Sequence, residues 1–194
     1  MALKLITAPS TEPVSLAEVK LHLRVDHTDE DTLITNLIKV AREMAEDATW
    51  RALMTQTWEM RLDTWPGMPL KLPKAPLQSI ASIKYLDENS IEGTVNTSIY
   101  DVDTFNEPGR IFFKKGQTWP SVNLYERGAV RIQFVCGWAS AETVSYKIKA
   151  GMLLLIGHLY ENREQVIIAS GLTPVELPMG VHALFASEKV WKEN

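Results

Sequence analysis

The side chains that most often carry chemistry in proteins are few in this 194-residue sequence, and their spacing is unfavourable. The four histidines are His22, His27, His158 and His182, and none forms a His-x-x-x-His or Glu-x-x-His pair of metal-ligand spacing. No glycine-rich phosphate loop, Gly-x-Ser-x-Gly elbow or Cys-His arrangement occurs. The sequence therefore predicts no enzyme, no cofactor and no metal site, with a hydrolase assembled from scattered histidines and carboxylates kept as an alternative.

Two other groups of reactive side chains are better explained by structure than by chemistry. Asp26, Asp29, Glu30 and Asp31 could hold a divalent cation, but they precede a helical pattern, where carboxylates cap the free amides and face the positive end of the dipole. The single cysteine, Cys136, ends the apolar pattern IQFVCG and is expected to be a buried small hydrophobe. One cysteine also excludes an intramolecular disulfide.

Composition places the chain among soluble globular proteins. Hydrophobic residues make up 45% and charged residues 23%, and the length suits one domain or a domain with a sizeable insertion. The formal net charge of -4 argues against a protein that grips nucleic acid by its phosphates. The first residues lack the features of a signal peptide, so synthesis in the cytoplasm is expected.

Helical patterns flank a region of strands. The longest apolar helical pattern is Thr143–Glu164, which we expect to be a buried central helix. Ser15 and Glu18 predict a capping box after an extended start, and a second, longer helix is expected to begin at Thr28 or Asp29 and run to about Ala52. The small residues of this second helix are predicted to pack closely against two glycines of the central one. These residues are Ala41, Ala45 and Ala48 on one side and Gly151 and Gly157 on the other.

Residues 55–137 alternate with a period of two and contain turn signals, which is typical of strands. Lys114–Arg127 is expected to be a long loop, which is either functional or a surface loop that the fold tolerates without a specific role. Each of the six tryptophans is expected either to pack in the core or to contact a partner, and the sequence does not distinguish these two roles. The predicted class is α+β, an antiparallel helical core of two long helices and shorter ones with an inserted small β-domain. The predicted divisions are 1–54 for the N-terminal helices, 55–137 for the insertion, 138–164 for the central helix and 165–194 for a C-terminal extension with a short helix.

Three blocks of sequence carry a resemblance. LLLIGHLYENRE, SLAEVKLHLRVDHTDEDTLITNLIKVAREMAED and RALMTQTWEMRLDTWP together resemble the head-tail connector proteins of tailed bacteriophages, a family also found in prophages and gene transfer agents. The similarity extends from about Ser15 to Leu184, and none of the blocks is a catalytic signature. The resemblance implies a structural adaptor in the virion, forming a ring of twelve subunits beneath the portal and helping to form the DNA channel.

The resemblance also implies partners. These are the portal protein, a tail-completion or stopper protein, further copies of the chain, and DNA that passes without sequence-specific binding; no membrane is involved. Residues expected to contact a neighbouring subunit are Glu161, Arg163 and Glu164. Candidates for portal docking are Val166, Ile167, Ile168, Leu172, Leu184, Phe185 and Trp191. The alternative is a DNA-packaging or DNA-binding accessory factor, which would need a basic face.

Overall fold

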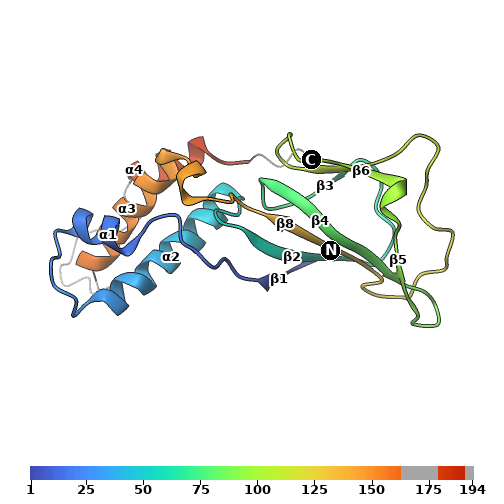
Figure 1. The fold of residues 1–194 in the computed structure, drawn as a ribbon, viewed down its shortest axis with the longest axis horizontal. Helices are drawn as coiled ribbons and strands as arrows, with labels where there is room; N and C mark the ends of the chain where they lie inside the picture. The colour runs from blue at the N-terminus through green and yellow to red at the C-terminus, as the bar shows by residue number, and fades with distance from the viewer. Residues whose placement is uncertain (163–178, 191–194) are drawn as a thin grey trace, which may run out of the picture. The chain divides into compact units, whose positions relative to one another are not determined.

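The computed structural model describes residues 1–162 and 179–190, and within them the chain is α+β, with four helices and two antiparallel sheets (Figure 1). It divides into two compact units. The β unit contains Met1–Ser10 and Met54–Trp138, and the helical unit contains Thr11–Leu53 and the described residues from Ala139 onward. The domain boundaries expected from the sequence remain a prediction, although the first ten residues cluster with the strands rather than with the helices.

A five-stranded antiparallel sheet forms the larger part of the β unit, in the order β1-β2-β8-β4-β5. Its strands are β1 (Ala2–Thr7), β2 (Gln56–Leu62), β8 (Val130–Cys136), β4 (Leu77–Leu86) and β5 (Glu92–Thr94). Ile132 lies opposite Met60 on one side and Ile83 on the other, and all three side chains are buried. The alternation predicted from the sequence therefore produces one apolar face, and Cys136 is buried at its end as expected.

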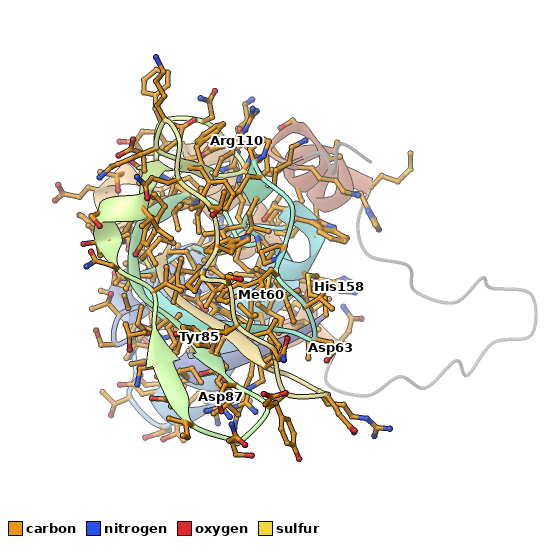
Figure 2. All side chains as sticks on the ribbon, turned by 90° about the vertical axis from the view of Figure 1, so that its right-hand side faces the viewer. Met60, Asp63, Tyr85, Asp87, Arg110 and His158 are labelled. Carbon is orange, nitrogen blue, oxygen red and sulfur yellow. The ribbon has the colours of Figure 1, made fainter. Side chains whose placement is uncertain are left out.

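A three-stranded sheet completes the β unit, in the order β3-β7-β6. Its strands are β3 (Leu70–Lys71), β7 (Arg110–Phe113) and β6 (Tyr100–Asp103), the last preceded by a short 3-10 helix, η1 (Thr97–Ile99). Two aspartates hold turns of the unit, and both are labelled in Figure 2. Asp63 accepts a hydrogen bond from the Gly128 amide at 2.8 Å, and Asp87 accepts one from the Ile91 amide at 2.8 Å.

The helical unit contains α1 (Leu16–Leu23), α2 (Asp31–Thr49), η2 (Ala141–Thr143), α3 (Tyr146–Glu161) and α4 (Met179–Ser187). The capping box predicted for α1 is confirmed, because the Glu18 amide donates to Ser15 Oγ at 3.2 Å and the Ser15 amide donates to Glu18 Oε2 at 2.7 Å. These hydrogen bonds from the Ser15 backbone and side chain lower the pKa of Glu18 below its ordinary value.

The predicted start of α2 at Thr28 or Asp29 is wrong. Its N-cap is Glu30, whose side chain makes no capping bond. Asp31 instead forms an ion pair with Lys20 at 2.6 Å, and the same ammonium donates to the His27 carbonyl. Asp31, which the sequence predicted to cap this helix, therefore pairs with a side chain of α1 instead.

The expected partner of the two glycines is also wrong. A Cβ added at Gly151 would meet the ring of Phe185, on α4, at 2.5 Å, and one added at Gly157 would meet His22, on α1, at 3.5 Å. The close approaches are therefore to α4 and α1 rather than to the alanines of α2. Helix α2 still packs against α3, and Ile34, Ile38, Met152 and Leu155 are buried between the helices of the unit. None of the described helices is long and apolar enough to cross a bilayer.

Candidate functional site

One of the residues expected to contact a neighbouring subunit is described, and it lies at the end of α3. Glu161 is the last residue of this helix and is exposed, whereas Arg163 and Glu164 lie outside the described residues. The helix ends at Asn162, whose side-chain amide donates to the His158 carbonyl at 2.8 Å. His158 lies in the last turn of α3 and is partly buried.

Most of the portal-docking candidates lie outside the described residues: Val166, Ile167, Ile168, Leu172 and Trp191. Two are described, and both belong to α4. Phe185 is 5% exposed and packs over Gly151, so its ring is part of the core of the helical unit. Leu184 is half-buried and retains exposed apolar surface. Helix α4 is thus fixed to its own unit by Phe185, and only Leu184 of the described pair can offer surface to a partner.

The carboxylates around the start of α2 are distributed among separate partners. Asp31 pairs with Lys20, Asp29 lies 3.9 Å from His27 Nδ1, and Glu30 accepts a hydrogen bond from the hydroxyl of Tyr160. No group of three or more histidine, cysteine or carboxylate side chains within residues 1–162 and 179–190 could hold a metal ion. Asp31 thereby joins α1 to α2, and Glu30 joins the start of α2 to α3.

An aromatic cluster that sequence reasoning missed holds the segment predicted as a long loop. The ring of Trp119 stacks on Trp65 with centroids 4.8 Å apart, and Phe113 meets its edge at 5.0 Å. The indole nitrogen of Trp119 donates to the Pro66 carbonyl at 2.7 Å. The rings of Tyr85 and Trp65 meet edge to face, with centroids 5.4 Å apart. The loop is therefore attached to β7 and to the segment after β2 by ring contacts, for which the sequence offered only an excess of tryptophan.

Replacing Trp119 with alanine is expected to lower the free energy of unfolding by about 3 kcal/mol, because a stacked ring and its hydrogen bond are lost together. Urea titration measures this change, and near-ultraviolet circular dichroism reports the loss of the stacked pair. The matched control is Phe105→Ala, since Phe105 is 94% exposed. That control should change stability by less than about 0.5 kcal/mol. Similar costs for the two variants would contradict a role of Trp119 in holding the loop.

The exposed Phe105 stands at the tip of the β6-β7 hairpin. Asp103 accepts hydrogen bonds from the Phe105 amide at 2.9 Å, the Asn106 amide at 3.1 Å and the Asn106 side chain at 2.6 Å. The Asn106 bonds are the main cause of a lowered pKa at Asp103. These hydrogen bonds stabilise the turn, and it presents a large apolar side chain to solvent.

The fold of this chain is similar to that of chains in gene transfer agent particles. It matches a chain from the neck of an empty gene transfer agent (GTA) particle computed with C6 symmetry, with a TM-score of 0.80 and 23% identity over 100% of this chain and 98% of that one. A chain from the virion of a native GTA particle gives the same TM-score, identity and coverage. A chain from the neck of a native GTA particle computed with C12 symmetry gives 0.76 and 22%, again over 100% and 98%.

The sequence adds the family. Residues 13–112 match the phage gp6-like head-tail connector proteins, and the chain belongs to this family, which confirms the resemblance seen in the sequence. No curated protein matches the sequence. The family match covers α1 and α2 and continues into β7, so it includes parts of both units.

Proposed function

We propose that the protein is a structural head-tail connector, which forms a ring beneath the portal of a phage or phage-like particle and joins the DNA-filled head to the tail. The observation that carries this proposal is membership of the head-tail connector family together with a fold match that covers the whole chain. Similar chains come from necks computed with C12 and C6 symmetry, which supports a homo-oligomeric ring, of twelve subunits in this proposal. The location is then the virion, after synthesis in the host cytoplasm.

The proposed ring surrounds part of the DNA channel. A formal net charge of -4 suits a surface past which DNA moves without binding, because tight binding to phosphates requires clustered lysine and arginine. No catalytic step is part of the proposal. In this arrangement α2 and α3 form the helical core, and residues 55–137 are an insertion between helical segments, as proposed from the sequence.

We assign portal docking to the C-terminal part of the chain. The candidates Val166, Ile167, Ile168 and Leu172 are apolar residues in a stretch without a helical or alternating pattern, which suits a contact made against a partner. Leu184 and Trp191 extend this set. Phe185 has a different role in the proposal, because its ring fixes α4 to α3 and leaves the rest of the segment as the docking part.

Loss of the protein is expected to leave DNA-filled heads that do not join tails, and addition of purified protein is expected to restore joining. Electron microscopy and infectivity or gene-transfer titre measure the joined particles. The triple variant Val166→Asp/Ile167→Asp/Ile168→Asp should remain folded and lower the joined fraction at least about tenfold, because buried carboxylates cost several kcal/mol at an apolar contact.

The control for this experiment changes α4 without touching the proposed docking residues. Ala183→Asp/Ala186→Asp places two carboxylates at exposed positions of the helix and should restore joining as the wild type does. A wild-type protein that restores no joining would overturn the connector function. A triple variant that joins heads and tails normally would overturn only the docking assignment.

A further inference from the structure

The five-stranded sheet has two open edges on opposite sides. Strand β1 pairs with β2 and is the last strand on its side, so the outer edge of its six residues has no partner strand among the described residues. On the other side, β5 pairs with β4 from Lys84 to Leu86, and the Val95 amide extends this pairing to Ile83. Residues 77–82 of β4 therefore form a second unpaired edge in the described part of the chain, also six residues long.

A groove runs beside the open part of β4. Its volume is about 370 Å³, and β6, the outer strand of the smaller sheet, forms the opposite wall. Ser79 and Ile80 line it from β4, and Tyr100, Asp101 and Val102 line it from β6. The groove is thus bounded by two strand edges and combines unpaired backbone groups with apolar side chains, which is the type of site that accepts an added strand.

The exposed edge of β1 has the matching properties. Its side chains Leu5 and Ile6 are 38% and 45% exposed, an unusual amount of apolar surface on an unpaired edge. Lys4, which precedes Leu5 in the same strand, is an exposed cation. In the groove, the Asp101 side chain is 69% exposed, with Lys114 at 3.6 Å, so a further cation can approach this carboxylate.

We propose that β1 of one copy adds to the open edge of β4 in a second copy, with Leu5 or Ile6 entering the groove and Lys4 facing Asp101. The apolar surface of β1 and the opposite charges of Lys4 and Asp101 favour this occupant over an unrelated peptide. The contact joins two different surfaces, so every copy can use both at once. Contacts of this kind close into rings when the rotation between copies allows it.

This inference rests on the proposed connector function and specifies how neighbouring subunits of the ring meet. It also explains why the two edges can stay exposed in a single copy. An unpaired apolar edge strand is an association site, and the ring would cover both of its edges in every subunit. The helical unit need make no part of this contact.

Cysteine cross-linking of the full-length protein tests the proposal. Ile6→Cys places a thiol on β1 and Ser79→Cys places one on the open edge of β4, both at exposed positions, while the natural Cys136 is buried and gives no background. After assembly into joined particles, a short bis-maleimide should link the double variant into a ladder of trimers and longer multimers. Each single variant should give no species larger than a dimer.

The control variant moves one cysteine away from the groove. Ile6→Cys/Glu126→Cys keeps the β1 thiol and places the second at an exposed position outside residues 77–82, and it should give no ladder. Circular dichroism verifies that all variants are folded, and the joining assay verifies that they assemble. A double variant that joins heads and tails but forms no ladder, or a control that forms the same ladder, would overturn the edge contact and leave the connector function in place. Failure of joining by the wild type would instead overturn the connector function itself.

Discussion

Replacing Gly137 with alanine is expected to destabilise the β unit by more than about 4 kcal/mol, because backbone strain and a clash with backbone atoms occur together. The residue has a φ of +99°, which an L side chain rarely adopts. An added Cβ would also lie 2.1 Å from the carbonyl oxygen of Met54, which is backbone and cannot rotate away. Urea titration followed by circular dichroism measures the change.

Gly137 leaves no room for a side chain because the backbone after β8 lies against the backbone before β2. Gln56 pairs with Cys136 at the ends of β2 and β8, and the Thr55 hydroxyl donates to the Trp138 carbonyl at 3.2 Å. The Gln78 side chain also donates to the Gly137 carbonyl at 2.7 Å. A displaced Gly137 would therefore disturb the ends of three strands together.

The matched control is Gly116→Ala. Gly116 has a φ of +78°, but nothing lies within 4 Å of an added Cβ, so only the backbone strain remains. Its expected cost is about 1 kcal/mol, the usual penalty for a left-handed alanine. Equal losses at the two glycines would show that the clash with Met54 does not decide the outcome.

A second large effect is expected at a buried group of charges in the helical unit. Arg42, whose side chain is 9% exposed, donates to Glu12 at 2.9 Å and to Glu46 at 3.2 Å. Glu46 also accepts a hydrogen bond from the Leu53 amide at 2.9 Å, beyond the end of α2. Burial raises the pKa of Glu12, and this outweighs the opposite effect of Arg42. The guanidinium thus joins the segment before α1 to the last turns of α2.

Substituting Arg42 with methionine is expected to lower the free energy of unfolding by about 3 to 5 kcal/mol at neutral pH, because two carboxylates lose their shared cation in a buried site. The methionine keeps most of the aliphatic packing. Thermal and urea unfolding measure the loss. The control is Glu43→Gln, which removes the exposed partner of Arg42, found at 3.5 Å, and should cost less than about 0.5 kcal/mol.

The pH dependence of the methionine variant identifies the cause. The pKa of Glu12 is already raised in the folded protein, and removal of the cation raises it further, so protonation favours the folded state. The deficit relative to wild type should therefore be greatest above this raised pKa and decrease as the pH falls through it toward the ordinary value of 4.5. A deficit that stays constant over this range would indicate lost packing rather than unpaired charge.

Local features of the sequence determined much of the secondary structure. The capping box at Ser15 and Glu18 needs only two residues three positions apart, and the alternation in β2 and β8 needs only neighbours in the strand. The burial of Cys136 follows from the same alternation. The resemblance to head-tail connectors was likewise carried by contiguous blocks and is confirmed by the family match.

The tertiary structure decided which distant segments meet. Lys20 takes Asp31 away from capping, Phe185 rather than an alanine of α2 occupies the space at Gly151, and Trp119 is placed on Trp65. Pairing of β1 with β2, at least fifty positions along the chain, likewise leaves one open edge opposite that of β4. Each of these contacts joins residues that no local period relates, because a helix or strand specifies which face is apolar but not which segment will cover it.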